Sequence, residues 1–414
     1  MKFEEFGINA KILRSIDELG YKRPTDIQFK AIPPILKGED VLAIAQTGTG
    51  KSAAFVIPVL HMLQKKKRSH ADGVRCIVMV PTHELAIQIT DVFKQIGKHT
   101  SLKFTAIYGG TEQDTQIEQL KKGTDVLIAT PGRVFDFVNQ GHLKIYNAEM
   151  LILDEADHML ALGFIKDIED LIKYLPKQRQ TLFFSATIDA KIKKLAYSLV
   201  RRPIRIQISP KNPVAKNIEH SLAFIKMDDK RFFLERVVNS HPENKILVFV
   251  RTKVRAERVK KAMERVDIES VTIHSDKSQK ERSEAMESFK SGKIKVLIAT
   301  DVSARGIDIP NVEYVVNYDI PEVPENYVHR VGRTGRAKNK GYAISFCSDE
   351  EKELLTQIET YVGGSIDVVD LGSDDYADTI DFSSETSTDW KNLMKEAEQN
   401  EQNFKPKKKK KKKK

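Results

Sequence analysis

The sequence predicts an α/β protein made of two parallel-sheet lobes in series, followed by a disordered tail. Short apolar runs rich in β-branched residues alternate with amphipathic helical stretches, which is the βαβ pattern of a parallel sheet covered on both faces. The alternation stops at a stretch of prolines and polar residues near the middle of the chain and then resumes. Beyond Ser365 the composition becomes acidic and poor in aliphatic residues, which disfavours a packed fold.

The apolar runs define the expected strands and domain boundaries. Strands of the first lobe are predicted at 41–45, 76–80, 126–129, 150–153 and 181–184, and those of the second at 246–250, 271–273, 296–299, 314–316 and 342–346. The predicted first lobe is a nucleotide-binding domain over 31–208, to which the segment 1–30 also belongs. A linker follows at 209–216, then a second domain over 217–364 and a tail over 365–414.

Composition limits the class of protein. With 414 residues, 40% of them hydrophobic and 30% charged, the chain falls in the ordinary soluble range and is too long for one compact core. It has no run of 18 apolar residues and no signal-like N-terminus, so we expect a cytoplasmic protein. Cys76 and Cys347 lie far apart in apolar runs with no metal-ligand spacing, so both are interpreted as core residues in a reducing compartment.

The charge distribution favours a polyanionic partner. Residues 365–403 hold eleven acidic residues against two lysines, and Lys405 with 407–414 adds nine positive charges that cancel this block. The formal net charge of +10 therefore lies on residues 1–364. We interpret the lysine tail as an arm that attracts phosphate, although a nuclear-address signal has the same composition. The acidic block is compatible with a segment that folds over the basic face or pairs with the tail.

A phosphate-binding loop is predicted after the first strand. The run 41–45 leads into Gln46-Thr47-Gly48-Thr49-Gly50-Lys51-Ser52 and then a helix-compatible segment, the strand, loop and helix context that a P-loop needs. Glycines let backbone N–H groups surround phosphate oxygens, Lys51 reaches the β- and γ-phosphates, and the Ser52 hydroxyl can coordinate Mg²⁺. Ala45 stands where the general pattern has its first glycine. Taken alone, the loop could be a Gly-Thr turn beside a chance lysine.

Carboxylates follow the apolar run 150–153 directly, where doubly wound sheets place their ligands. Asp154 is predicted to hold Mg²⁺ through water, and Glu155 to orient and deprotonate the water that attacks the γ-phosphate. Asp157 is expected to communicate with neighbouring motifs. An isolated acidic cluster after a strand is usually a solvated turn, and it is the pairing with the P-loop that favours catalysis.

With these residues, the chain resembles the DEAD-box RNA helicases, named for the tetrapeptide at 154–157, over a span from about Phe3 to Phe346. The resemblance implies two RecA-like domains of the P-loop NTPase fold in helicase superfamily 2. It also implies an RNA-stimulated ATPase that uses ATP and Mg²⁺ to separate short RNA duplexes locally, without processive movement. The expected partner is RNA held through its backbone, with no membrane and a monomeric state. Ribosomal or RNA-decay proteins are possible further partners.

The resemblance assigns an ATP site and a catalytic set. Gly20 to Gln28 is similar to the adenine-reading Q motif, since an amide can pair with adenine's edge, and Phe3 has the spacing of its stacking aromatic. Taken alone, Gln28 would be a surface residue and Phe3 a core anchor. The expected nucleotide contacts are Phe3, Lys22, Thr25, Gln28, Ala45, Gln46, Thr47, Gly48, Thr49, Gly50, Lys51, Ser52, Gly306 and Asp308. The catalytic residues are Lys51, Asp154, Glu155, Arg333 and Arg336, with the two arginines as arginine fingers.

The resemblance also assigns RNA contacts and coupling residues. The RNA-binding set is Pro81, Thr82, His83, Gly110, Thr130, Arg133, Arg251, Thr252, Gln279, Arg282 and Thr300, and the coupling set is Asp157, Ser185, Thr187 and His329. Each RNA motif alone could be a helix cap or a turn. His83 departs from the family's usual arginine, and a mostly neutral imidazole is a poorer phosphate partner, so we expect a weaker and more pH-sensitive contact.

Two other functions remain compatible with the motifs. One is an ATP-gated RNA clamp that holds RNA or nucleates a complex, and the other is a DNA translocase built on the same paired lobes. The Q motif and the Asp-Glu-Ala-Asp spelling favour RNA. The second lobe has no P-loop of its own, so one ATP per molecule is expected. Ribosome assembly, RNA turnover and cold adaptation are all compatible roles.

Overall fold

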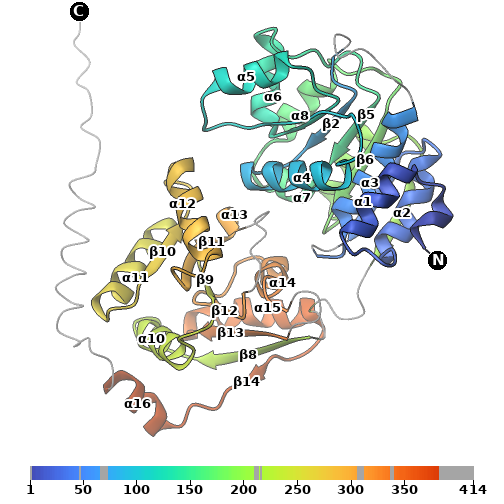
Figure 1. Ribbon diagram of the computed structural model, residues 1–414. Helices are drawn as coiled ribbons and strands as arrows, with labels where there is room; N and C mark the ends of the chain where they lie inside the picture. The colour runs from blue at the N-terminus through green and yellow to red at the C-terminus, as the bar shows by residue number, and fades with distance from the viewer. Residues whose placement is uncertain are drawn as a thin grey trace, which may run out of the picture.

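The protein has two lobes, each built on one parallel sheet with helices packed against it (Figure 1). This computed structural model describes residues 2–45, 48–65, 73–208, 214, 217–304, 312–335 and 340–381. The predicted linker, 209–216, therefore lies outside the described residues except for Val214, and so do the tail lysines. Among the helices in the described ranges, none combines the length and apolar character needed to cross a bilayer.

The first lobe is a seven-stranded parallel sheet in the order β3-β4-β2-β5-β6-β1-β7. Its strands are β1 (Val41–Ala45), β2 (Cys76–Met79), β3 (Phe104–Ile107), β4 (Val126–Ala129), β5 (Met150–Leu153), β6 (Gln180–Ser185) and β7 (Ile204–Ile208). Its helices are η1 (Phe3–Phe6), α1 (Ala10–Glu18), α2 (Asp26–Leu36), α3 (Lys51–Lys65), α4 (His83–Ile96), α5 (Gln113–Lys121), α6 (Pro131–Asn139), α7 (Ala156–Ala161), α8 (Ile165–Ile172) and α9 (Ala190–Leu199).

The second lobe repeats this architecture with the order β10-β11-β9-β12-β13-β8-β14. Its strands are β8 (Ile218–Phe224), β9 (Ile246–Val250), β10 (Ser270–Ile273), β11 (Val296–Thr300), β12 (Tyr314–Asn317), β13 (Gly341–Cys347) and β14 (Asp367–Val368). Its helices are α10 (Lys230–Ser240), α11 (Lys253–Arg265), α12 (Gln279–Lys290), α13 (Asp301–Ala304), α14 (Pro324–Val331), η3 (Asp349–Glu351), α15 (Lys352–Val362) and α16 (Ser373–Asp381).

Alternate residues of each central strand feed two separate cores, one on each face of the sheet. In β1, Val41 and Ala43 pack with the helices α2 to α4, whereas Leu42 packs on the opposite face with residues of α6 to α9. The second lobe divides β9 in the same way. Because both faces are covered, these strands are continuously apolar, which explains why the sequence reveals them.

The structure confirms the predicted strands, with boundaries that differ by one residue at most at either end. The prediction missed β3, β7, β8 and β14. β3 is an edge strand with half-buried positions, and β8 reads Ile-Glu-His-Ser-Leu-Ala-Phe, so neither presents a continuous apolar run. Both are placed by their neighbours in the sheet rather than by their own composition.

The prediction that the tail begins at 365 is wrong for residues 365–381. β14 extends the sheet beside β8, and α16 lies against α10. The ring of Tyr376 lies 4.9 Å from that of Phe233, its hydroxyl donates to Asp229 Oδ2 at 2.9 Å, and it accepts from the Lys226 N–H at 3.0 Å. One aromatic anchor with satisfied polar atoms thus fixes a segment whose acidic composition predicted disorder.

Replacing Tyr376 with alanine should therefore destabilise the second lobe. Loss of a partly buried ring and its hydrogen bonds costs about 2 kcal/mol, and the unfolding temperature of that lobe should fall by a few degrees in a thermal scan. Tyr146→Ala is the matched control because its side chain is 58% exposed. Equal shifts for both variants would show that α16 is not anchored through Tyr376.

Candidate functional site

A cleft of about 1450 Å³ runs between the lobes and collects seven of the fourteen predicted nucleotide residues. The first lobe contributes Lys22, Thr25, Gln28, Gly48, Gly50, Lys51, Ser52, Asp154 and Glu155, and the second contributes Gln279, Arg282 and Arg333. The strand ends of β1 and β5 place their loops at the same edge of the sheet, which is why residues a hundred positions apart meet here.

The loop after β1 has the backbone that a phosphate cradle requires. Gly48 and Gly50 have φ values of 82° and 92°, and a Cβ on Gly50 would lie 2.6 Å from Gln28 Nε2. α3 begins at Lys51, so its first N–H groups face the loop. The Lys51 side chain is 6% exposed, and its amine has no hydrogen-bond partner among the described residues. A buried ammonium in this position requires an anion.

The carboxylates after β5 differ in their electrostatics. Burial raises the pKa of Asp154 to about 6 in spite of nearby Lys51. Burial also acts to raise the pKa of Glu155, but His158 and Lys51 outweigh it and lower that pKa to about 2. Glu155 adopts a left-handed backbone with φ 51° and ψ 49°, a strained conformation that is typical of functional sites.

The residues near Lys51 fit a divalent cation. Asp154 is a buried carboxylate whose charge is disfavoured by desolvation, and a hard cation would relieve that cost. The Ser52 hydroxyl stands at the start of α3 on the same cleft. Oxygen donors beside a phosphate loop are the ligand type that Mg²⁺ prefers.

The Q-motif segment is tied to the phosphate loop. Gln28 accepts from the Thr25 N–H at 3.0 Å and donates to the Gly50 carbonyl at 3.2 Å, so the amide bridges two motifs. Phe3, in contrast, is 2% exposed and packs edge-on against Phe6 in the core. The structure places Phe3 as a core anchor and not among the residues that line the cleft.

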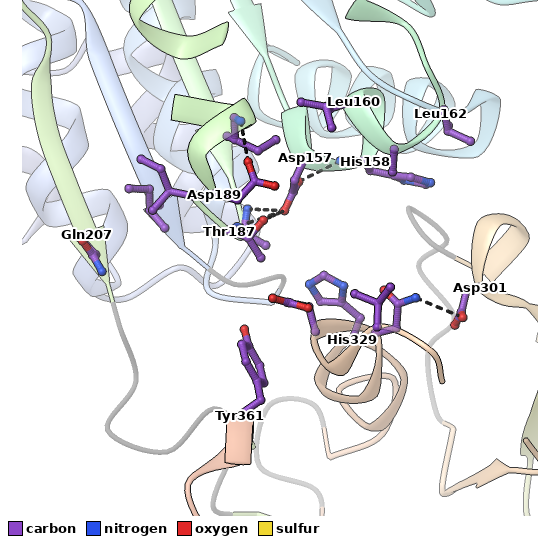
Figure 2. Close-up of a pocket in the computed structure, with 18 of the residues that line it drawn as sticks. Asp157, His158, Leu160, Leu162, Thr187, Asp189, Gln207, Asp301, His329 and Tyr361 are labelled. Atoms are coloured by element: carbon purple, nitrogen blue, oxygen red, sulfur yellow. Dashed lines mark hydrogen bonds between the residues drawn. The ribbon is translucent and has the colours of Figure 1, made fainter. Parts of the chain in front are cut away.

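The Asp-Glu-Ala-Asp segment is joined to the end of β6 through one carboxylate oxygen. Asp157 Oδ2 accepts from the Ala186 N–H, the Thr187 N–H and the Thr187 hydroxyl, at 3.0 to 3.1 Å. Ser185, by contrast, is fully buried in β6. Asp157 and Thr187 line a second interlobe cavity of about 720 Å³, where His329 and Tyr361 of the second lobe face them (Figure 2).

Two pairs of side chains connect the lobes beside the cleft. His83 Nδ1 lies 2.9 Å from Gln279 Oε1, and Glu84 Oε1 forms an ion pair with Arg282 Nη2 at 2.8 Å. The His83 ring stacks on Tyr108 at 5.2 Å, above the predicted backbone contact at Gly110. The structure thus brings His83, Gln279 and Arg282 together, although they lie on different lobes.

The other predicted RNA-binding residues are divided between the two lobes. Thr82 caps α4 and Thr252 caps α11 through their hydroxyl groups. Pro81, Thr130, Arg133 and Thr300 are buried, and Arg133 donates to the Thr111 carbonyl at 3.3 Å. Arg251 is exposed but pairs with Glu351 at 2.8 Å. Several of these residues therefore position loops through their side chains.

Arg333 is 5% exposed, donates to the His329 carbonyl at 3.2 Å and lines the cleft from the second lobe. Thr49 lies in the described part of the phosphate loop, and Ala45 is buried at the end of β1. Five predicted residues lie outside the described ranges, namely Gln46, Thr47, Gly306, Asp308 and Arg336.

Sequence reasoning missed residues that act through the predicted ones. Glu84 belongs to the Pro-Thr-His-Glu run, but its pairing with Arg282 of the second lobe depends on how the lobes are arranged. Glu351 accepts from Arg251, from buried Lys230 and from the Ile320 N–H, so it fixes the loop that carries Arg251. His158 directly follows the tetrapeptide, and its only sequence signal was that adjacency.

Comparisons with known proteins agree with this geometry. A family model described as DEAD/DEAH box helicase matches residues 25–195, and one described as helicase conserved C-terminal domain matches 229–338. The chain is 41% identical over 360 residues to an ATP-dependent RNA helicase CshA of Listeria monocytogenes, covering 86% of this chain and 68% of that one. It is 38% identical to the DEAD-box ATP-dependent RNA helicase RhpA of Helicobacter pylori, covering 89% and 74%.

Solved structures with the same fold include two complexes. Dbp5 of S. cerevisiae bound to RNA and ADP BeF3 superposes with a TM-score of 0.81 at 30% identity, covering 91% of this chain and 97% of that one. The DEAD-box helicase Mss116 bound to ssRNA and UDP-BeF gives a TM-score of 0.82 at 26% identity, covering 94% and 84%.

Proposed function

Because the chain belongs to the DEAD/DEAH box helicase family and is an ATP-dependent RNA helicase, we propose that its two lobes form one ATPase site and one RNA-binding surface. The observation that carries this proposal is the buried Lys51 amine, which has no hydrogen-bond partner among the described residues and lies in a cleft that Arg333 lines from the other lobe. Lys51 belongs to the first lobe and Arg333 to the second, so the triphosphate site is complete only when the lobes meet.

In this proposal the first lobe binds ATP, and the Q motif recognises its adenine base. The N–H groups around Gly48 and Gly50 bind the phosphates, and Lys51 neutralises them. Gln28, already fixed to the Gly50 carbonyl, links adenine recognition to the conformation of the loop. Mg²⁺ would be held by Ser52 and by Asp154 through water, where it would offset the charge of the phosphates.

Glu155 is the proposed general base. Its low pKa keeps it ionised at neutral pH, so it can accept the proton of the attacking water. The water oxygen bonds to the γ-phosphorus while the bond to the β-bridging oxygen breaks, and Arg333 stabilises the charge that develops. Asp157 is hydrogen-bonded to the Thr187 backbone and hydroxyl. Through these bonds, a shift of the Asp-Glu-Ala-Asp segment on cleavage of the γ-phosphate is transmitted to the end of β6 and to the second cavity.

RNA is expected to bind across both lobes next to the His83–Gln279 junction. Backbone contacts make binding largely independent of sequence, and closure of the lobes bends one strand so that a short duplex separates. ATP hydrolysis then weakens the interlobe contacts and releases the strand. We infer a monomeric enzyme, because Lys51 and Arg333 of one chain line the same cleft from its two lobes.

The test is steady-state ATP hydrolysis with single-stranded RNA, with DNA of the same sequence and without nucleic acid. We expect strong stimulation by RNA alone, and its absence in Glu155→Gln. Equal stimulation by DNA would favour a translocase. Absence of any stimulation, with slow RNA release in a non-hydrolysable ATP analogue, would favour a clamp.

His83 should make RNA affinity depend on pH. A histidine side chain gains charge as the pH falls from 8 to 6, so RNA binding should strengthen over that range by more than in His83→Arg. The arginine variant should also bind RNA more tightly at pH 8, by roughly 1 kcal/mol, since guanidinium is a permanent phosphate partner. Fluorescence anisotropy at both pH values measures this. Identical affinities for the two proteins at pH 6 and pH 8 would refute the weaker, pH-sensitive contact.

We further propose a cytoplasmic location. Cys76 and Cys347 are both free and buried, as expected for a protein of a reducing compartment. Ribosome assembly and RNA turnover are pathways in which a sequence-independent RNA helicase of this kind would act, and co-purification with ribosomal particles or RNA-decay proteins would distinguish them.

A further inference from the structure

His158 is a buried polar side chain without an evident structural task. It lies in the first turn of α7 and is 3% exposed. Neither ring nitrogen has a hydrogen-bond partner among the described residues. Buried polar atoms are nearly always satisfied, and an apolar residue would fill this space at lower cost. The imidazole therefore needs another explanation.

The nearest charged group is the proposed general base. His158 Nδ1 lies 3.5 Å from Glu155 Oε2, which is slightly longer than a closed hydrogen bond. The backbone secures this approach, because the His158 N–H donates to the Glu155 carbonyl at 3.0 Å and to Asp157 Oδ1 at 3.1 Å. Catalytic hydrogen bonds are often long before the substrate is bound and tighten afterwards.

The ion pair with His158 is a contact that can orient the Glu155 carboxylate. Its backbone is in the strained left-handed region, and no other side chain in the described ranges makes an ion pair with it. Lys51 and Arg333 act on it electrostatically, and both are needed by the triphosphate. On its other side His158 lines the second interlobe cavity, which also contains Asp157 and His329 (Figure 2).

We propose that His158 is a positioning residue for hydrolysis, whose Nδ1–H holds Oε2 of Glu155 so that Oε1 is aimed at the attacking water. This role rests on the proposed function of Glu155 as general base. A proton fixed on Nδ1 by the carboxylate leaves Nε2 as an acceptor on the side away from Glu155. His158 is not among the residues that line the nucleotide cleft, so its loss should affect the rate of the chemical step and not ATP binding.

Asparagine and glutamine separate the two ring nitrogens. The amide nitrogen of asparagine can occupy the position of Nδ1, and that of glutamine the position of Nε2. The experiment compares His158→Asn, His158→Gln and His158→Leu by RNA-stimulated ATP hydrolysis, with KM for ATP and RNA affinity measured on the same preparations. We expect kcat to fall roughly tenfold or more in the glutamine and leucine variants, by analogy with other orienting partners of reactive groups. KM should stay unchanged, and the asparagine variant should recover most of kcat.

Several results would overturn the proposal. Equal kcat values for the asparagine and glutamine variants would show that Nδ1 has no special role, and unchanged kcat in all three would show that His158 only fills space. If the leucine variant does not fold, as judged by circular dichroism, the comparison of kcat between the asparagine and glutamine variants still tests the proposal. Glu155→Gln is assayed in parallel. Hydrolysis that persists in that variant refutes the proposed base, whereas a failure confined to the His158 variants refutes only the positioning role.

Discussion

Arg333→Ala is expected to lower the kcat of RNA-stimulated ATP hydrolysis by about 10³-fold or more, because an arginine finger typically contributes 10³ to 10⁵ to phosphoryl transfer. Arg333 is almost fully buried, lines the cleft from the second lobe and exerts its charge on Glu155. Nucleotide binding should change much less, since the phosphate loop and Lys51 belong to the first lobe. The measurement is steady-state hydrolysis at saturating ATP and RNA, with nucleotide affinity determined by a fluorescent analogue.

The matched control is Arg14→Ala, which removes an arginine whose side chain is 70% exposed and paired with Glu18 on α1. It should retain full activity. Arg336 lies three positions beyond Arg333 and supplies the natural comparison. If Arg333→Ala keeps its kcat within about twofold while Arg336→Ala loses it, the charge stabilisation belongs to Arg336, and the assignment of Arg333 is wrong.

Glu155→Gln is expected to reduce ATP hydrolysis by roughly 10² to 10⁴-fold, the usual contribution of a positioned general base. Glutamine keeps the size of the side chain and removes the group that accepts the proton of water. ATP and RNA binding should persist, because neither depends on that proton transfer. The variant should therefore hold RNA in the presence of ATP much longer than the parent protein does.

Single-turnover hydrolysis and RNA dissociation, measured on the same complex, test this expectation. Glu39→Gln is the control, since its side chain is exposed outside the cleft. Rapid RNA release from Glu155→Gln in ATP would contradict the idea that hydrolysis opens the lobes. Retained hydrolysis would instead require a different base, and Asp154 would be the next residue to replace.

The sequence by itself determined the two sheets and the motif-bearing loops. β1, β5, β9 and β11 are buried on both faces, so continuous apolar runs mark them, and their ends carry the conspicuous residues. The P-loop and the Asp-Glu-Ala-Asp segment are contiguous, and the chemistry of each can be read within a few residues. These local signals were sufficient to identify the family and the expected reaction.

Only the tertiary structure decided which of these residues meet. His83 and Gln279 lie 196 positions apart, and their contact depends on how the lobes pack. The same holds for the burial of Phe3 in the core and for the docking of α16 through Tyr376, which an acidic composition concealed. His158 is notable only in the structure, where its buried ring lies 3.5 Å from Glu155 Oε2 and has no hydrogen-bond partner among the described residues. Periodicity and motifs predict secondary structure and burial from neighbouring residues in the sequence. Contacts between distant side chains depend on how the elements pack in space, which no local pattern encodes.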